Sequence, residues 1–236
     1  MVRGDLAHDP GLQPTPLRGP DGPFVGAAPR PLERWAREPR LQQLLAELAA
    51  AFGPQRWWPA HTPFEVLVGA VLTQNTRWSN VELALARLRA GRALTPARLL
   101  AQPSAVLQHM LHPAGTYRIK ARRLLSLSHW YLDSGGLQKM QERSLGPLRQ
   151  DLLGVHGIGP ETADAILCYG AGRLTPVVDA YARRVLGRHG LVDPRTPYEE
   201  LRVWLLQALE PELLAYQEFH ALVVRAGTQA CGIVAR

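Results

Sequence analysis

The sequence predicts an all-α protein of about ten helices joined by short loops. From Leu32 onward, apolar residues recur every three or four positions, which is the spacing of an amphipathic helix. Runs of alternating β-branched residues, which indicate strands, are few. Pro or Gly stands at most junctions between the periodic segments, where it separates one helix from the next. These junctions are Pro63, Pro96, Pro103, Gly115, Pro147, Gly159, Gly172 and Pro197.

The first two helices are defined by their apolar residues, and the later ones by the same periodicity. One face of the first helix carries Leu41, Leu44, Leu45 and Leu48. The second is strongly apolar through Phe64, Leu67, Val68, Val71 and Leu72. No repeat of the kind found in solenoid proteins occurs. Further helices are expected near residues 80–90, 97–101, 103–110, 118–134, 145–153, 160–170, 179–189, 197–209 and 212–228.

The chain of 236 residues is long enough for one large domain or two small ones with a real core. Residues 1–31 are rich in Pro and Gly without periodicity, which predicts a disordered tail. The sequence contains no apolar run of membrane-spanning length and no compact secretory signal. Two cysteines, Cys168 and Cys231, cannot build a disulfide framework. A cytoplasmic protein without a membrane partner is therefore expected.

The net charge of +7 favours a polyanionic partner. Among the 27 basic residues, only Lys120 and Lys139 are lysines. Arginine suits bidentate contacts to phosphate, but its guanidinium stays protonated and does not act as an amine nucleophile. The chain thus offers few candidates for Schiff-base chemistry.

The most informative stretch is a glycine-containing turn followed by an aspartate. Gly157 and Gly159 let the backbone approach a ligand closely, and Pro160 suits the first position of a helix. Such a turn presents N–H groups to a phosphate at the positive end of a helix. Asp179 stands at the expected start of another helix. Taken alone, each feature has a simpler interpretation, since glycine turns join many helices and Asp is a common N-cap.

Over residues 35–230 the chain resembles the helix-hairpin-helix DNA glycosylases, the superfamily that includes endonuclease III. The resemblance is carried by LLGVHGIGPETADAILCY and VVDAYARRVLGRHGLV, and upstream by VLVGAVLTQNTRWSNV and GTYRIKARRLLSL. It implies two helical subdomains with the active site in the cleft between them. One is a six-helix barrel, residues 63–172, containing the helix-hairpin-helix motif. The other is a bundle of N- and C-terminal helices, residues 32–62 and 173–236.

The resemblance also implies roles for single residues. Asp179 matches the catalytic aspartate, whose carboxylate can stabilise the positive charge that develops on the sugar or activate water. Gln74 matches the position that enters the duplex near the flipped base. The hairpin Gly157, Ile158 and Gly159 matches the turn that holds the DNA backbone, with Ile158 anchoring it. Lys120 lies in a stretch that looks like the start of a DNA-contacting helix.

One departure from the superfamily pattern, at the position of a lysine, narrows the expected chemistry. Strand-nicking members carry a lysine two positions after the second hairpin glycine, where this chain has Glu161. A glutamate cannot form an imine, so a monofunctional, hydrolytic glycosylase is expected. As a first-turn carboxylate beside the helix dipole, Glu161 needs no catalytic role.

Related enzymes often hold a [4Fe-4S] cluster on four C-terminal cysteines. Only Cys231 lies in that region, while Cys168 is expected in the core. We expect no cofactor and no metal, unless the chain is cut short before further ligands.

The aromatic residues point to a branch of the superfamily. The run FGPQRWWP…FEVLVGAVLTQNTRW resembles 3-methyladenine DNA glycosylase III. That resemblance places the flipped base between Trp57 and Trp78, with Trp58 and Pro59 shaping the wall. Aromatic faces attract the cationic rings of alkylated purines. The branch has a modified lysine on its last long helix, where this chain has His220 and no lysine, and we expect His220 to be a core histidine.

Three functions remain open on the sequence. The first is a monofunctional glycosylase that flips and excises alkylated purines such as 3-methyladenine from double-stranded DNA, acting as a monomer. The second is an endonuclease III-like glycosylase for oxidised pyrimidines with weak or no lyase activity. The third is a DNA-binding helix-hairpin-helix protein without catalysis, against which Asp179 argues because a carboxylate repels phosphate.

Overall fold

The computed structural model describes residues 35–229, and these residues are almost entirely helical. The only β-type contact in this range is an isolated bridge between Ala36 and Leu209. The all-α prediction is therefore confirmed for the described part of the chain. The predicted tail at residues 1–31 and Cys231 lie outside it. No helix within residues 35–229 is long and apolar enough to cross a membrane.

The helices follow the predicted ranges closely, with one addition. Helix α7 was not predicted, because it is short and buries little apolar surface beyond Met140. It begins at Gly136, and both Gly136 and the preceding Gly135 have positive φ angles. The α-helices are α1 (Pro39–Phe52), α2 (Pro63–Leu72), α3 (Trp78–Ala90), α4 (Pro96–Leu100), α5 (Ser104–Leu111), α6 (Tyr117–Asp133), α7 (Gly136–Glu142), α8 (Leu145–Leu153), α9 (Pro160–Ala165), α10 (Ala180–Arg188), α11 (Tyr198–Ala208) and α12 (Leu213–Gln229).

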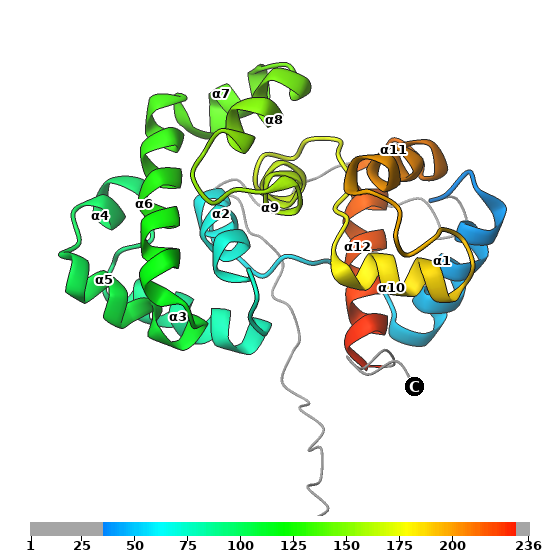
Figure 1. The fold of residues 1–236 in the computed structure, drawn as a ribbon, viewed down its shortest axis with the longest axis horizontal. Helices are drawn as coiled ribbons and strands as arrows, with labels where there is room; N and C mark the ends of the chain where they lie inside the picture. Colours follow the sequence, from blue (N-terminus) through cyan, green and yellow to red (C-terminus); the bar gives the residue numbers. More distant parts are fainter. Residues whose placement is uncertain (1–34, 230–236) are drawn as a thin grey trace, which may run out of the picture.

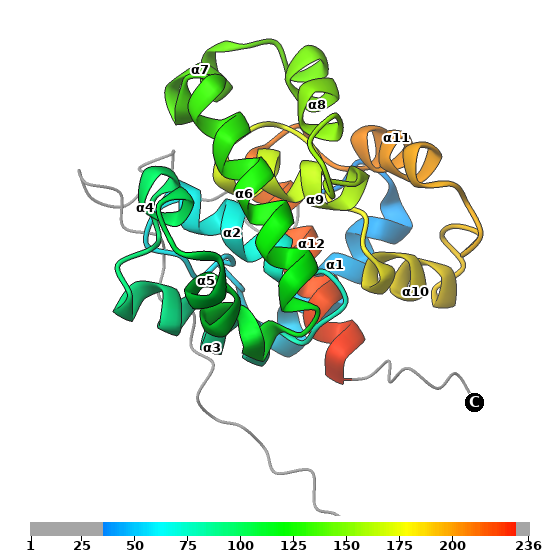
Figure 2. The same ribbon diagram turned by 60° about the vertical axis from the view of Figure 1, so that its left-hand side comes forward.

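Helices from the two ends of the chain lie together in space. Figures 1 and 2 show α1 beside α10, α11 and α12, while α3 to α8 form the opposite side of the molecule. Helix α12 packs against α10 and α1. Helices α2 and α9 lie between these groups, and α2 packs against the segment that follows α9. This arrangement brings residues near positions 57, 78, 169, 179 and 220 within reach of one another.

Helix α2 forms the centre of the core. Thr62 caps its first turn by accepting a hydrogen bond from the Glu65 backbone N–H, and Pro63 occupies its first position. All residues from Phe64 to Leu72 are buried. An all-round apolar helix of this kind is typical of a fully buried element.

The helix predicted at residues 160–170 has a different form from the expected one. Helix α9 ends at Ala165, and Ile166–Gly170 continue as a short π-helix, η3. Every residue from Thr162 to Gly170 is buried, so the expectation of an amphipathic helix was wrong. Single π-turns inside helices often occur at functional sites because the wider turn redirects a side chain. Here the affected residues include Tyr169.

Candidate active site

Asp179 is both a helix cap and a carboxylate with one oxygen left for chemistry. Its Oδ1 accepts a hydrogen bond of 2.7 Å from the Ala182 backbone N–H, which caps α10 as the sequence predicted. The residue is 9% exposed. Its Oδ2 lies 3.7 Å from Nε2 of His220 on α12. The cap fixes the orientation of the carboxylate and leaves Oδ2 facing the site.

The segment before Asp179 is held by a buried ionic network. Asp164 on α9 accepts two hydrogen bonds of 2.9 Å from the guanidinium of Arg149 and one of 2.9 Å from the Thr175 hydroxyl. Tyr198 donates to it at 2.8 Å, and Arg202 lies 3.4 Å away. Since Thr175 belongs to the segment that ends at Asp179, this network ties α8, α9 and α11 to the candidate catalytic residue.

His220 is buried, as expected for a core histidine, but it also faces Asp179. Its Nδ1 lies 2.8 Å from the Tyr169 hydroxyl, whose single hydrogen can be donated to that nitrogen or to the Gln217 carbonyl 2.9 Å away. Burial, followed by nearby Cys168, Glu218 and Asp179, raises the pKa of Tyr169 well above its usual value, so the phenol stays protonated. His220 therefore links Tyr169 on η3 to Asp179 at the start of α10.

Glu161 contributes a second carboxyl group to the same region. Its side chain is open to solvent at one side, yet protein atoms crowd the carboxyl group. This burial and the negative charge of Asp179 raise the pKa of Glu161 to about 6, while His220 and Arg183 act in the opposite direction. The first-turn position expected from the sequence is correct, but the group is also electrostatically coupled to Asp179.

The predicted pocket residues form a continuous aromatic series that leads to His220. The ring centroids of Trp57 and Trp78 are 4.8 Å apart, and those of Trp58 and Trp78 are 5.3 Å apart. Trp58 then contacts Tyr169 at 5.2 Å, and Tyr169 contacts His220 at 5.6 Å. Residues from the loop before α2, from α3, from η3 and from α12 thus converge beside Asp179.

The space between Trp57 and Trp78 is closed in this arrangement. Their rings meet edge to face at 64°. A base stacked between two rings needs about 7 Å between their planes, because each stacking contact takes roughly 3.5 Å. The two tryptophans must separate before a base can lie between them. Trp78 and Trp58 each have an indole N–H that is buried without a hydrogen-bond partner among residues 35–229.

The loop that carries Trp57, Trp58 and the half-buried Pro59 is fastened to α12. The buried carboxylate of Glu218 accepts hydrogen bonds from the backbone N–H groups of Gln55 at 2.8 Å and Arg56 at 2.5 Å. Arg56 has a positive φ of 48°, a conformation that such bonds help to hold. Because burial raises the pKa of Glu218, its charge depends on these donors. Helix α12 consequently positions both the aromatic series and Asp179.

The hairpin has the geometry expected of a turn whose backbone can approach a ligand closely. Gly157 has a φ of +83°, and a Cβ atom there would collide with the Arg123 side chain. Ile158 is 5% exposed and anchors the turn in the core. Gly159 is open to solvent, and its carbonyl accepts from Ala163 at 2.9 Å at the start of α9. The turn therefore leaves an open glycine surface at a helix N-terminus.

Gln74 is bonded to the hairpin in this structure. Its side-chain amide donates to the Gly157 carbonyl and to the Thr162 hydroxyl, each at 3.0 Å, and Arg123 donates to its carbonyl oxygen. To enter a duplex, Gln74 would have to exchange these bonds for contacts with DNA. Its role at the flipped base stays a prediction.

Lys120 is not placed for a phosphate contact, contrary to the sequence expectation. It is 1% exposed, and its ammonium group donates to the carbonyls of Leu72 at 2.8 Å and Ala114 at 2.6 Å. Burial, with a smaller contribution from Arg123, lowers its pKa to about 8. The lysine ties the end of α2 to the start of α6, because carbonyls at a helix C-terminus need donors.

Cys168 lies in the core, as predicted, with no exposed surface. Burial, followed by the charge of Asp164, raises the pKa of its thiol, which keeps it protonated. Within residues 35–229 no group of three or more His, Cys, Asp or Glu side chains is arranged for a metal ion. The expectation that the protein needs no cofactor stays a prediction.

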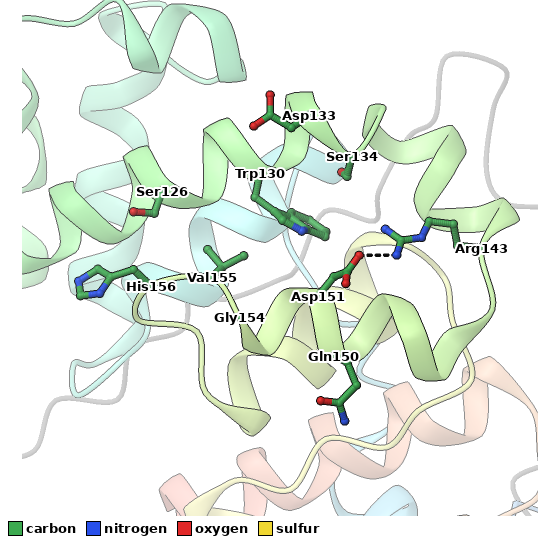
Figure 3. A pocket seen from close by; sticks show the side chains of 10 residues that line it. All are labelled: Ser126, Trp130, Asp133, Ser134, Arg143, Gln150, Asp151, Gly154, Val155 and His156. Carbon is green, nitrogen blue, oxygen red and sulfur yellow. Dashed lines mark hydrogen bonds and ion pairs between the residues drawn. The ribbon is translucent and has the colours of Figure 1, made fainter.

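One recess of the described residues lies outside this site. It has a volume of about 710 Å³ and opens between α6 and α8. Figure 3 shows Trp130 at its wall, with the ion pair of Arg143 and Asp151 beside it, and His156 at the hairpin end. None of the aromatic series and neither Asp179 nor His220 lines it. We assign no role in base release to this recess.

Sequence reasoning missed Tyr169, Glu218 and Asp164, which together position the site. One signal was available, since Glu218 and His220 interrupt an otherwise apolar helix face in LLAYQEFHALVV. Buried polar residues on such a face require partners. The identity of the partners depends on contacts between helices that are distant in sequence.

Comparisons with known proteins agree with this geometry. A family model described as HhH-GPD superfamily base excision DNA repair protein matches residues 68–211. A protein of Methanocaldococcus jannaschii named "Putative DNA repair glycosylase" is 38% identical over 183 residues, covering 76% of this chain and 83% of that protein. Endonuclease III of Thermotoga maritima is 30% identical over 169 residues, covering 72% and 75% respectively.

Solved structures share the fold. The chain superposes on a crystal structure of H. pylori 3-methyladenine DNA glycosylase bound to 1,N6-ethenoadenine with a TM-score of 0.67 and 28% identity, covering 80% of this chain and 94% of that one. A non-covalent endonuclease III–DNA complex gives a TM-score of 0.70 with 23% identity, covering 84% and 88%. The second likeness shows the fold alone.

Proposed function

Because this chain belongs to the HhH-GPD superfamily of base excision DNA repair proteins and is a DNA glycosylase, we propose that it is a monofunctional enzyme that removes alkylated purines such as 3-methyladenine. The observation that carries the proposal is the aromatic series from Trp57 to Tyr169, which ends at His220 beside Asp179. It supplies base-stacking surface next to a carboxylate.

The proposed reaction begins when the damaged nucleotide leaves the duplex. A glycosylase cannot reach the glycosidic bond inside the stack, so the base must be flipped into a pocket with apolar or aromatic walls. Trp57 and Trp78 are the candidate walls, with Trp58 and Pro59 behind them. Their edge-to-face contact has to open for the base to enter, and the stacking gained on entry offsets the lost contact.

Breaking the glycosidic bond leaves positive charge on the sugar. The carboxylate of Asp179, with Oδ1 fixed by the α10 cap, offers Oδ2 to stabilise that charge or to activate the attacking water. Alkylation at a ring nitrogen makes the purine cationic and a good leaving group, so little acid catalysis is needed. Aromatic faces attract such a cationic ring. These properties favour alkylated purines over oxidised pyrimidines.

The similarity to H. pylori 3-methyladenine DNA glycosylase supports this lesion class. The similarity to Endonuclease III of Thermotoga maritima supports the alternative, an oxidised-pyrimidine glycosylase with weak or no lyase activity. We propose further that the partner is double-stranded DNA with one damaged base, and that the protein acts on it as a monomer in the bacterial cytoplasm.

A test of the substrate class compares two damaged DNAs. We expect the wild-type protein to release 3-methyladenine from DNA treated with a methylating agent and no base from duplexes containing thymine glycol. Free bases are separated by chromatography and identified by mass. Release of thymine glycol alone would establish the alternative, and release from neither DNA would contradict the proposed function.

We expect no strand cleavage because of the lysines that the chain has. Glu161 occupies the position of the superfamily lysine, Lys120 is buried against two carbonyls, and Lys139 pairs with Glu142 on α7 at 2.7 Å. None of these side chains is an available amine beside Asp179. We therefore expect borohydride to trap no covalent complex between the protein and a duplex with an abasic site, as measured on denaturing gels.

The Glu161→Lys variant is the matched positive control for this experiment. It places an amine at the position where the carboxyl group is coupled to Asp179, so we expect borohydride to trap this variant but not the wild type. Efficient trapping of the wild-type protein would contradict the monofunctional assignment.

A further inference from the structure

His220 stands between a tyrosine and the candidate catalytic carboxylate. Its Nδ1 lies 2.8 Å from the Tyr169 hydroxyl and its Nε2 lies 3.7 Å from Oδ2 of Asp179. The imidazole is 6% exposed and the carboxylate 9% exposed. An electrostatic contact in such a dry environment is screened much less than one in water.

The hydrogen-bond roles constrain which nitrogen carries a proton. The Tyr169 hydroxyl has one hydrogen and two possible acceptors, the Gln217 carbonyl and Nδ1 of His220. If it donates to Gln217, then Nδ1–H of His220 donates to the phenol oxygen. A neutral ring of that form would point a lone pair at Oδ2 of Asp179, which repels it. If the hydroxyl donates to Nδ1 instead, Nε2 carries the hydrogen. The second arrangement is favourable, because it places an N–H of His220 toward Oδ2 of Asp179.

His220 also acts on a second carboxyl group of the site, that of Glu161 on α9. Burial and Asp179 at the start of α10 raise the pKa of Glu161, and Arg183 on α10 lowers it. The positive charge of His220 opposes the rise in the Glu161 pKa, which burial and Asp179 bring to about 6. Removing that positive charge would raise the Glu161 pKa further.

This inference rests on the proposed function of base release. We propose that His220 is a positioning residue for that reaction: Tyr169 holds its ring, and the ring faces Oδ2 of Asp179 with an N–H at 3.7 Å, an electrostatic contact longer than a hydrogen bond that orients the carboxylate. Oδ1 is already fixed by the α10 cap, so His220 controls the rotation of the carboxylate toward the sugar.

The first test replaces His220 with leucine and with glutamine. In single-turnover assays on methylated DNA, His220→Leu lowers the base-release rate by roughly a hundredfold, because a misplacement of about 1 Å has effects of that order. His220→Gln retains an N–H near the position of Nε2 and recovers part of the rate. Neither variant supplies the positive charge that lowers the pKa of Glu161, so this pKa rises in both. The acid limb of the rate profile, where the carboxyl group of Glu161 ionises, therefore moves to higher pH. Affinity for a duplex with a tetrahydrofuran abasic analogue stays unchanged.

The second test asks whether Tyr169 acts through His220. Tyr169→Phe removes one hydroxyl, and we expect a rate loss of about tenfold in the wild-type background. In the His220→Leu background the same change has no further effect, since coupled residues are not additive. The matched control is His109→Gln, on the exposed surface of α5, which leaves rate and pH profile unchanged. Additive losses, or a wild-type pH profile in His220→Leu, would overturn the proposal.

A third measurement needs no substrate and separates this proposal from the proposed function. Thermal unfolding midpoints are compared for wild type, His220→Gln, Asp179→Asn and the double variant. We expect the unfolding midpoint of the double variant to fall by less than the sum of the two single-variant decreases, because both changes remove the same contact. Additive shifts overturn the His220–Asp179 contact. If the shifts are coupled but wild type releases no base from methylated DNA, the lesion assignment fails while the contact stands.

Discussion

Replacing Asp179 with asparagine is expected to abolish base release while DNA binding persists. Asparagine is as good an N-cap as aspartate, so the hydrogen bond to the Ala182 backbone and the start of α10 are retained. What is lost is the negative charge that stabilises the developing positive charge on the sugar. We expect a decrease of at least about a thousandfold in the single-turnover rate, equivalent to roughly 4 kcal/mol of transition-state stabilisation.

The measurement pairs base release with binding. Affinity for a duplex containing a tetrahydrofuran analogue is expected to stay the same or to increase, because a carboxylate near phosphates is removed. The Asp193→Asn variant is the control, since Asp193 is exposed and paired only with Arg195 in the part of the chain that the structure describes. A turnover rate of Asp179→Asn within tenfold of the wild type would remove the catalytic assignment.

Replacing Asp164 with alanine is expected to cause the largest loss of stability. Asp164 is fully buried and accepts hydrogen bonds from Arg149, Thr175 and Tyr198. Without it the Arg149 guanidinium keeps only Glu199 as an acidic partner in the described range. Breaking a buried ion pair by removing one partner typically costs about 3–5 kcal/mol. We expect a decrease of that size in the free energy of unfolding, measured by urea denaturation.

The control is Asp193→Ala, which breaks a surface ion pair and should leave the unfolding midpoint unchanged. The folded fraction of Asp164→Ala should also release bases more slowly, since Thr175 no longer fixes the segment that ends at Asp179. A loss of less than about 1 kcal/mol would show that the network contributes little beyond an ordinary hydrogen bond.

Much of the fold was predictable because it depends on local patterns. The apolar spacing located eleven of the twelve α-helices between residues 35 and 229, and Pro or Gly marked most of their boundaries. Helix α7 was missed because its seven residues bury mainly Met140. The π-turn at Ile166–Gly170 was missed because the hydrogen-bond register within a helix is not visible in the apolar pattern.

Site residues could be predicted from the sequence where a local backbone conformation favours one type of residue. Asp179 as a cap, Gly157 at a positive φ and Ile158 as an anchor depend mainly on their neighbours in sequence. Lys120 was misjudged because a basic residue near a helix start looks like a phosphate ligand. Its actual acceptors, the carbonyls of Leu72 and Ala114, are presented only when α2 and α6 pack together.

The sequence by itself determined the all-α class, the hairpin, the capping aspartate and the glutamate in place of a lysine. These features depend on backbone preferences and residue chemistry within a few positions. Only the tertiary structure decided that Tyr169, His220 and Glu161 surround Asp179, and that the tryptophans lie next to them. Those contacts join residues from α9 to α12, and they form because buried polar groups must find partners when the helices pack into one core.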